Sequence, residues 1–462
     1  MRLRRRPLMN KNPEEDLSCR LNWIDPFFNS VKDRIFFRDT DDVLIVPPNQ
    51  VYKLNKTGIR MLAHLSSGKG IHSFPGLISA ERIDETHAFF KALQALYSTG
   101  TVGNDPAALQ ALESAPYDFN FTRLPILAEI AVTYRCNNSC SFCYLPPRNG
   151  TREKELSTKQ IKKIIDIFYS EAKVPFFSFT GGEPLVRKDI ETLVRYAAGK
   201  GITTNLVSNG TLCTPNRARA LKNAGLGSAQ LSVEAPEAGL HDTLVARKGA
   251  FYETLKGLEN LQDVGIPVQT NTTLNAANAE AVLTLPGFLA EQRIKRFAVN
   301  LFIPVGTGRL HPELFLSYSD AGAYIRKLSI EAERYGQTFY WYSPTPYCIF
   351  NPLAEGLGNK SCAAADGLLS ISPRGDILPC SSYHRTLGSI LNDGFEKIWF
   401  ASRARYFKEK KYAPAECGGC SSFLACQGAC PLYWDFAGTG ELTVSKTAAS
   451  RGQVGKYARS AV

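Results

Sequence analysis

Tyr134-Arg-Cys-Asn-Asn-Ser-Cys-Ser-Phe-Cys-Tyr144 carries three cysteines, Cys136, Cys140 and Cys143, in a CxxxCxxC spacing. The run before it, Leu127-Ala-Glu-Ile-Ala-Val-Thr133, is short, apolar and bounded, which predicts a buried strand with the cysteines on the loop that follows. Three thiolates on one tight loop can hold three irons of a 4Fe–4S cluster, which normally takes four cysteines, so the fourth iron is left for a ligand from outside the protein. A zinc loop is the alternative, but zinc sites usually add a second pair of Cys or His ligands, and none follows within the next sixty residues.

The composition limits the class and the compartment of the protein. The 462 residues carry a formal net charge of +11, but the basic side chains are scattered apart from Arg2-Leu-Arg-Arg-Arg6, which favours a solvated tail over a nucleic-acid surface. No apolar run is long enough to span a membrane, and no apolar segment follows the basic N-terminus as in a signal peptide. Twelve cysteines without a secretion signal indicate metal ligation in a reducing compartment. We therefore expect a cytoplasmic protein that binds neither nucleic acid nor membrane.

The first quarter of the chain predicts a small α+β domain at 29–103, between a flexible tail at 1–28 and a linker at 104–123. Short β-rich runs separated by Asp and Pro-Asn turns predict an antiparallel unit, and two amphipathic helices follow, the first capped by Asn55. The expected strands are 34–38, 43–46 and 51–54, and the expected helices are 56–66 and 81–98.

Between 124 and about 330, strand patterns alternate with helix patterns, and Ser157-Thr-Lys-Gln160 has the form of a capping box that opens a helix. Together with the run at 127–133, the strand candidates make six β/α units, which predicts a partial parallel barrel with its site at the carboxyl ends of the strands. The other five candidates are 176–180, 203–207, 229–234, 267–273 and 296–303.

Residues suited to ligand contact follow several of these strands. In Thr180-Gly-Gly-Glu-Pro184, the two glycines permit close backbone approach and Glu183 offers an acceptor for an ammonium group. Three further strand ends carry such residues: Ser208-Asn209-Gly210, Ser232-Val-Glu234 and Pro304-Val-Gly306-Thr-Gly308. For Asn209, Glu234 and Gly306, an ordinary turn or cap is the alternative.

Seven cysteines gather in the last third of the chain. A CxxCx5CxxxC pattern joins the last four, and Gly375 precedes Cys380 by five residues in what reads as a hairpin. A zinc ribbon is the alternative, because a CxxC pair fits one. The seven are Cys348, Cys362, Cys380, Cys417, Cys420, Cys426 and Cys430.

Together these motifs resemble the radical S-adenosylmethionine (radical SAM) enzymes of the peptide-maturase type, with a C-terminal SPASM extension that binds auxiliary 4Fe–4S clusters. The run Pro47-Pro-Asn-Gln-Val-Tyr-Lys-Leu-Asn-Lys-Thr-Gly58 resembles the winged-helix leader-peptide domain known from pyrroloquinoline quinone biosynthesis. The resemblance implies an α/β fold with a partial (β/α)6 TIM-like barrel at 124–330. It also implies a winged-helix-like domain at 29–103, a Cys-rich SPASM domain at 340–440 and a tail at 441–462.

The resemblance also implies roles for single residues. Cys136, Cys140 and Cys143 would hold the catalytic cluster, whose open iron chelates the methionine part of S-adenosylmethionine. The related enzymes usually place a cofactor-carboxylate arginine four positions after His241, where this chain has Val245, so Arg247 is either a re-registered replacement or a surface arginine. The residues implied in cofactor binding are Phe142 beside the adenine, Gly181, Gly182, Glu183 and Pro184 at the amine, Ser208 and Asn209 at the ribose and carboxylate, and Glu234, Arg247 and Gly306.

In the SPASM extension, the resemblance assigns Cys362, Cys380 and Cys430 to the first auxiliary cluster, with Cys348 completing it. It assigns Cys417, Cys420 and Cys426 to the second. The family's final cysteine is missing here, because no Cys follows Cys430. The second cluster would then have an open iron, a non-cysteine ligand or reduced stability.

The implied function is modification of a ribosomally made precursor peptide, by hydrogen abstraction that forms a thioether or carbon–carbon cross-link. The leader would add a strand near Val51, Tyr52 and Leu54, and flavodoxin or ferredoxin would supply the electron. One alternative is modification of a tetrapyrrole side chain, since Leu369-Ser-Ile-Ser-Pro-Arg-Gly-Asp376 resembles haem-pathway relatives. Another is a non-catalytic iron–sulfur protein that binds peptides or transfers electrons. No general base can be assigned.

Overall fold

The structure is a computed structural model that describes residues 19–46, 50–77, 79–99, 122–147 and 154–443. These residues fall into two compact units, one up to Arg123 and one from Leu124 onward. The predicted linker at 104–123, all but its last two residues, lies outside the described residues. None of the helices that the structure describes is long and apolar enough to cross a membrane.

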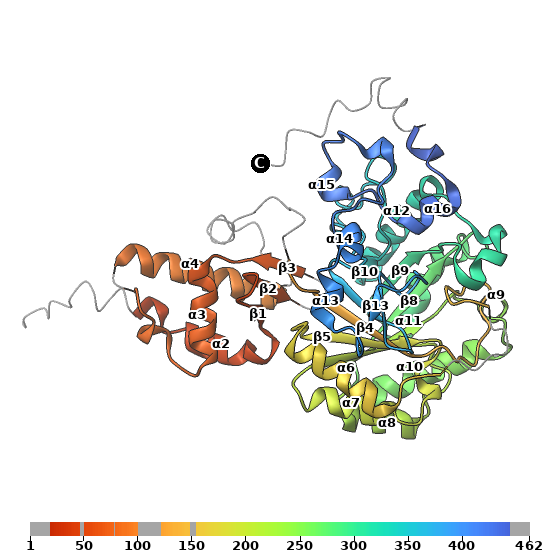
Figure 1. The fold of residues 1–462 in the computed structure, drawn as a ribbon. Helices are drawn as coiled ribbons and strands as arrows, with labels where there is room; N and C mark the ends of the chain where they lie inside the picture. Colours follow the sequence, from red (N-terminus) through yellow and green to blue (C-terminus); the bar gives the residue numbers. More distant parts are fainter. Residues whose placement is uncertain (1–18, 47–49, 78, 100–121, 148–153, 444–462) are drawn as a thin grey trace, which may run out of the picture. The chain divides into compact units, whose positions relative to one another are not determined.

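The first unit contains a three-stranded antiparallel sheet in the order β1-β2-β3, followed by two helices (Figure 1). Asn55 caps α3 as predicted, because its side chain accepts a hydrogen bond from the Gly58 backbone N–H at 2.8 Å. The predicted α+β unit is therefore confirmed. Its elements are β1 (Phe36–Arg38), β2 (Val43–Val46), β3 (Gln50–Lys53), α3 (Lys56–Ser66) and α4 (Ala80–Thr99), with short 3-10 turns at η2 (Lys32–Arg34) and η3 (Ile71–Ser73).

The unit begins earlier than the sequence predicted. Residues 19–28 were expected to belong to a tail, but η1 (Cys19–Leu21) and α2 (Ile24–Val31) lie there instead. Ile24, Phe28 and Val31 are buried in the core of the unit. Their spacing puts them on one face of a two-turn helix, which is too short for the pattern to stand out among polar neighbours.

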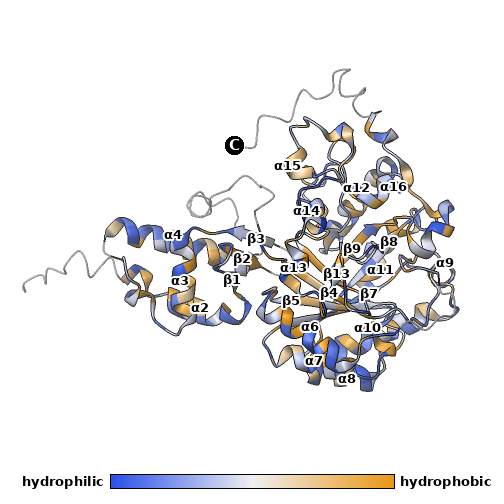
Figure 2. Cartoon of the chain, viewed as in Figure 1, coloured by the Kyte–Doolittle hydropathy of each residue, from blue (hydrophilic) through white to orange (hydrophobic). Residues whose placement is uncertain are grey.

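The second unit is built on a ten-stranded sheet in the order β10-β9-β8-β7-β6-β5-β4-β11-β12-β13. The six predicted barrel strands are present, adjacent and parallel, so the fold class is confirmed. Apolar residues predominate in β4, β5 and β9, whereas helices such as α7 and α8 carry both apolar and polar residues (Figure 2). The six strands are β4 (Leu127–Thr133), β5 (Phe176–Gly181), β6 (Thr203–Ser208), β7 (Ser228–Ser232), β8 (Val268–Leu274) and β9 (Arg296–Leu301).

Helices follow the strands along the chain. The predicted capping box opens α6, with Ser157 accepting from the Gln160 backbone and the Gln160 side chain reaching back to the Ser157 N–H. The helices of this part are α6 (Thr158–Ser170), α7 (Ile190–Ala198), α8 (Pro215–Ala224), α9 (Ala238–Leu244), α10 (Ala250–Asp263), α11 (Leu285–Glu291) and α12 (Tyr318–Arg334). Short 3-10 turns lie at η4 (Pro184–Val186), η5 (Ala281–Thr284), η6 (Gly306–Leu310) and η7 (Pro312–Leu314).

The Cys-rich extension continues the barrel sheet. β10 (Thr338–Trp341) adds to β9 in parallel, and β11 (Leu368–Ile371) adds to β4 in parallel at the opposite flank. β11 then forms the predicted hairpin with β12 (Asp376–Leu378), so Cys380 emerges beside the first barrel strand. The remaining elements are β13 (Gly388–Ser389), α13 (Phe395–Trp399), α14 (Ser402–Lys408), η8 (Ala415–Cys417), α15 (Phe423–Cys426) and α16 (Pro431–Ala437).

Barrel and extension share one hydrophobic core. Tyr433 on α16 stacks on Tyr318 at the start of α12, with ring centroids 3.8 Å apart, and its hydroxyl accepts a hydrogen bond from the Tyr318 backbone N–H at 3.0 Å. Both rings are fully buried. The position of the extension against the barrel is therefore fixed by packing, so their side chains can form one site.

Candidate active site

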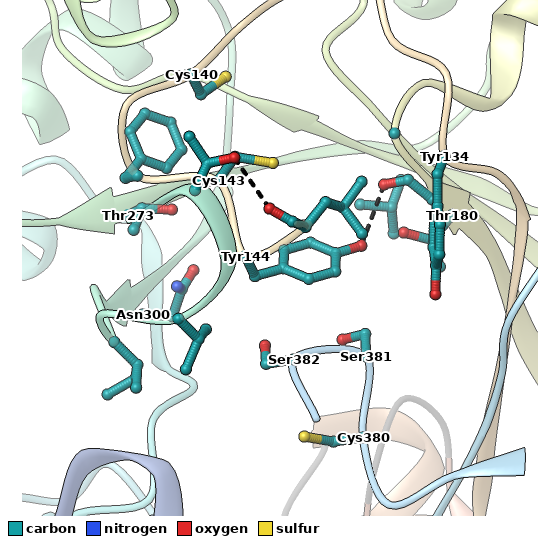
Figure 3. A pocket seen from close by; sticks show the side chains of 18 of the residues that line it. Tyr134, Cys140, Cys143, Tyr144, Thr180, Thr273, Asn300, Cys380, Ser381 and Ser382 are labelled. Carbon is teal, nitrogen blue, oxygen red and sulfur yellow. Dashed lines mark hydrogen bonds between the residues drawn. The ribbon is translucent and has the colours of Figure 1, made fainter. Parts of the chain in front are cut away.

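A cavity of about 1300 Å³ lies within the second unit, at the carboxyl ends of the parallel strands. The three cysteines of the CxxxCxxC loop line it together with Cys362, Cys380 and Cys430 of the extension. Cys140 and Cys143 project into this space from the loop, and Cys380, Ser381 and Ser382 from the segment after β12 (Figure 3). Two cysteine sets that are far apart in sequence thus face one chamber.

The three thiols of the cysteine loop are neighbours. Burial raises the pKa of Cys140 well above its usual value, and the nearby charges of Glu234, Cys143 and Cys136 raise it further. Three thiolates at this spacing repel one another unless a cation binds among them, because metal binding deprotonates and stabilises its thiol ligands. Side-chain and backbone N–H groups also reach Cys136 Sγ, from Asn209 Nδ2 at 3.7 Å and from the Asn138 backbone at 3.3 Å.

The loop is held from behind by the turn after β9. The Thr307 and Gly308 backbone N–H groups donate to the carbonyls of Leu145 and Cys143, at 2.7 and 2.9 Å. Gly306 has a φ of +57°, and a Cβ placed there would lie 2.1 Å from the carbonyl oxygen of Tyr144. Gly306 thus packs against the cysteine loop while its neighbours Val305 and Thr307 line the cavity, and its contact with a cofactor stays a prediction.

Gly181 and Gly182 join the end of β5 to the end of β4. A Cβ on Gly181, whose φ is +134°, would lie 2.1 Å from the Thr133 carbonyl oxygen, and one on Gly182 would lie 2.4 Å from that of Arg135. The Gly182 N–H donates to Thr133 O at 2.8 Å. Both glycines line the cavity next to Cys136, where the sequence predicted close backbone approach.

Glu183 does not face the cavity as the sequence predicted. One carboxyl oxygen accepts from the Leu185 N–H at 2.9 Å and the Ser208 hydroxyl at 2.8 Å, and the other accepts from the Asn209 N–H at 2.7 Å. Burial raises the pKa of Glu183 to about 7, although these hydrogen bonds oppose that shift. Glu183 is not among the residues that line the cavity, and its predicted contact with an ammonium group stays a prediction. Its carboxyl group instead positions Ser208 and Asn209, and the buried Pro184 opens the turn behind it.

Ser208, Asn209 and Phe142 are placed as a ligand-binding role requires. Asn209 lines the cavity and donates through Nδ2 to Asn137 Oδ1 at 2.9 Å, besides its contact with Cys136. Ser208 lines the cavity while its hydroxyl donates to Glu183. Phe142 also lines the cavity, and it packs against the buried Leu244 and Phe302. Their contact with a cofactor remains a proposal.

Glu234 lies in the cavity wall and is only 2% exposed. Burial raises its pKa to about 8, opposed by a hydrogen bond that one carboxyl oxygen accepts from the Thr273 N–H at 2.8 Å. His241 accepts from the Glu234 N–H through Nδ1 at 3.2 Å, and burial lowers the pKa of His241 to about 4, so this imidazole is neutral. A cation bound in the cavity would stabilise the ionised form of this buried carboxyl group.

Arg247 is not among the residues that line the cavity. Its guanidinium forms an ion pair with Glu253, while Val245 and His241 of the same segment line the cavity. Of the two alternatives for Arg247, the structure therefore favours the one without a cofactor contact.

Strands β8 and β9 contribute polar residues to the cavity wall that were not predicted from the sequence. Asn271 and Thr273 on β8 and Asn300 on β9 line the cavity, and Asn271 Nδ2 donates to Asn300 Oδ1 at 2.7 Å. The Oδ1 atom of Asn271 is buried and has no hydrogen-bond partner within the described part of the chain. A buried acceptor without a partner is costly, so a donor from a bound molecule would complete it. The signal in the sequence was the run of five polar residues within Val268-Gln-Thr-Asn-Thr-Thr-Leu274.

The extension gathers two sets of cysteines. In the first set, burial raises the pKa of Cys380 well above its usual value. The nearby charges of Cys362 and Cys430 raise this pKa further. In the second set, the pKa of Cys417 is raised to about 11. Burial is the main cause, and the nearby charges of Cys426, Cys348 and Cys420 contribute as well. Cys348 is therefore a neighbour of the second set in this structure, whereas the resemblance assigns it to the first set.

The donor chemistry of these sets fits iron–sulfur clusters. All donors are thiols, which are the soft ligands that such clusters take. Among the described residues, no three His, Cys, Asp or Glu side chains converge closely enough to hold a single metal ion. A four-iron cube is a larger body than one ion, and its thiolates stand at its corners.

We expect three 4Fe–4S clusters per chain after anaerobic reconstitution, because ten of the twelve cysteines fall into three sets. Iron analysis should then give about 12 irons per chain, counting four per cluster. A content near four irons, or one zinc per chain, would contradict this assignment.

Comparison with known proteins agrees with this geometry. The Radical SAM superfamily matches residues 130–277, and the iron-sulfur cluster-binding domain SPASM matches residues 362–421. The mycofactocin maturase MftC of Mycolicibacterium smegmatis is 30% identical over 333 residues, which are 68% of this chain and 80% of that protein. The AdoMet-dependent heme synthase of Nitratidesulfovibrio vulgaris is 28% identical over 336 residues, which are 66% of this chain and 88% of that protein.

A solved structure extends the likeness in fold. The crystal structure of Streptococcus suis SuiB bound to the precursor peptide SuiA superposes with a TM-score of 0.65 at 18% identity, covering 87% of this chain and 95% of that chain. Residues 124–462 make up less than three quarters of this chain. The likeness therefore extends into the amino-terminal unit.

Proposed function

This chain belongs to the radical SAM superfamily and carries a SPASM domain, and from that premise we propose that it matures a ribosomally made precursor peptide. It is an enzyme whose cofactors are 4Fe–4S clusters and S-adenosylmethionine. When bound, these supply a 5′-deoxyadenosyl radical that removes a hydrogen atom from the substrate.

The chain's own residues would bind and orient these groups. We propose that Cys136, Cys140 and Cys143 hold the catalytic cluster, with Asn209 donating to the Cys136 sulfur. Gly181 and Gly182 would let the cofactor's amine approach the backbone closely, and Phe142 would pack beside its adenine. Glu234 lies where it can face the cationic part of the cofactor, since it lines the cavity beside Cys140.

The presence of the amino-terminal unit is the main support for a peptide substrate. Its three-stranded sheet and helices precede the barrel, and the fold likeness to SuiB includes part of this unit. We propose that the leader adds a strand to the β1-β2-β3 sheet, which is a known mode of peptide capture. Val51 and Tyr52 on β3 are half-buried and could contact leader side chains, whereas Leu54 belongs to the core and cannot. In this function, flavodoxin or ferredoxin would supply the electron.

Binding of the precursor tests this function. The full-length chain is titrated calorimetrically with candidate precursor peptides, chosen from any short open reading frames near its gene. Proline placed in the paired segment of the leader should weaken binding, because it removes a donor of the strand ladder. Proline placed outside that segment is the matched control and should leave binding unchanged. Equal affinity for both peptides, or no binding to either, would contradict strand addition.

A second candidate is modification of a tetrapyrrole side chain. The identity to AdoMet-dependent heme synthases favours it, as do Arg135, Lys154 and Arg374 in the cavity lining, since cations bind carboxylate side chains of a porphyrin. Parallel anaerobic reactions with the precursor peptide and with a propionate-bearing iron porphyrin separate the two. A peptide product that has lost two hydrogens supports the maturase. A modified porphyrin and an unchanged peptide would favour the alternative.

A further inference from the structure

Cys348 lies near the cysteines of the second auxiliary set. Cys348 lies in a tight turn in which the Ile349 and Phe350 N–H groups both donate to the Pro346 carbonyl at 3.0 Å. The Tyr347 N–H of the same turn donates to Cys426 Sγ at 3.4 Å. The turn is therefore fixed against the set formed by Cys417, Cys420 and Cys426.

The chain separates the two sets between Cys426 and Cys430. Gln427, Gly428 and Ala429 all have left-handed backbones, with φ of 59°, 77° and 62°. Two of these residues are not glycine, so the conformation is held by the surrounding fold. After this turn, Cys430 lies with Cys362 and Cys380 in the cavity lining, which the four members of the other set do not join.

All twelve cysteines of the chain are among the described residues, so the count is complete. Cys19 lies in the other unit. Cys213 is buried in the barrel core, where its carbonyl accepts a hydrogen bond from Asn260 Nδ2 at 2.8 Å. Cys213 therefore cannot complete the set of Cys362, Cys380 and Cys430, and the Cys19→Ala control described below tests Cys19.

We propose that Cys348 is the fourth ligand of the second auxiliary cluster, in place of the cysteine missing after Cys430. The first auxiliary cluster then has only three cysteines, and its fourth iron is accessible from the cavity that the catalytic loop also lines. Thiolates are well suited to the irons of such clusters, so we infer that an exchangeable thiolate binds there. The metal assignment is independent of the substrate. Only the further step, that a cysteine of the precursor supplies this thiolate, rests on the proposed function.

The test isolates each auxiliary cluster in turn. All variants carry Cys136→Ala, Cys140→Ala and Cys143→Ala, which remove the catalytic cluster. Adding Cys380→Ala leaves only the second auxiliary cluster with its full set. A cube with three cysteine ligands loses its fourth iron on mild oxidation and gives the EPR signal of a 3Fe–4S cluster, whereas a cube with four cysteines resists.

We expect no such signal from the Cys380→Ala protein, and its appearance once Cys348→Ala is added. Cys19→Ala is the matched control and should change nothing. A 3Fe–4S signal that is already present with Cys348 intact, and that Cys348→Ala does not alter, would overturn the assignment.

The reciprocal variant decides the question if the Cys380→Ala protein fails to hold iron. Cys420→Ala in the same background leaves the first auxiliary cluster. We expect a 3Fe–4S signal on oxidation, and a shift of the EPR spectrum of the reduced cluster when 2-mercaptoethanol is added. If the cluster resists oxidation and its EPR spectrum does not change when 2-mercaptoethanol is added, the proposal is overturned. No peptide is present, so these outcomes are independent of whether the enzyme acts on one.

Discussion

Replacing Cys136, Cys140 and Cys143 together by alanine is expected to abolish formation of 5′-deoxyadenosine from S-adenosylmethionine and reductant. These three thiols neighbour one another in the cavity wall beside Gly181, Gly182 and Asn209, where the cofactor would bind. Iron analysis should show a loss of about four irons of about 12, because the two auxiliary sets lie on other segments. Anaerobic turnover followed by chromatography of the nucleoside products measures the activity.

Cys19→Ala is the matched control for this experiment, because Cys19 is exposed and lies in the other unit. It should leave both the iron content and the nucleoside yield at the level of the unaltered chain. If the triple variant still cleaved the cofactor, the catalytic cluster would have to lie elsewhere. If it lost nearly all its iron, the three sets would not be independent.

Gly306→Ala is expected to lower cofactor cleavage on the order of 100-fold, the size of effect that a displacement of about 1 Å can have on catalysis. The new methyl group would lie 2.1 Å from the Tyr144 carbonyl and 2.4 Å from that of Leu145. Both are backbone atoms of the cysteine loop, so the loop itself has to move. The measurements are the yield of 5′-deoxyadenosine and the EPR signal of the reduced catalytic cluster.

Gly336→Ala separates this clash from the cost of the backbone conformation. Gly336 has nearly the same left-handed φ, +63° against +57°, but a Cβ there meets nothing within 4 Å. Both variants should lose about 1–3 kcal/mol of stability from the strained backbone. Only Gly306→Ala should lose the catalytic cluster signal. Equal activity of the two variants would show that the turn at Gly306 does not support the cysteine loop.

Local sequence patterns predicted the type of ligand chemistry and the order of the domains. Short strand-like runs that alternate with helix patterns located the six barrel strands, because each such run is local in the sequence. Cysteine spacing singled out the CxxxCxxC loop, because its three ligands lie within eight residues and need no distant contact to come together. The same locality made the Asn55 cap and the Ser157 capping box predictable, since each joins residues three apart.

Contacts between residues that are far apart in the sequence became visible only in the tertiary structure. Glu183 has the right type and place in the sequence to face a ligand, but its carboxyl group is occupied by Ser208 and Asn209 from the next strand. Arg247 could have faced the cavity, but Glu253 on the following helix pairs with it.

The cysteines of the extension follow the same rule. Cys348 lies 14 residues before Cys362 in sequence, yet the turn at Pro346 is hydrogen-bonded to Cys426. The parallel pairing of β11 with β4 joins segments about 240 residues apart and brings Cys380 to the catalytic loop. Local patterns fix elements and ligand types, whereas pairing partners depend on sheet order and core packing, which no short stretch of sequence contains.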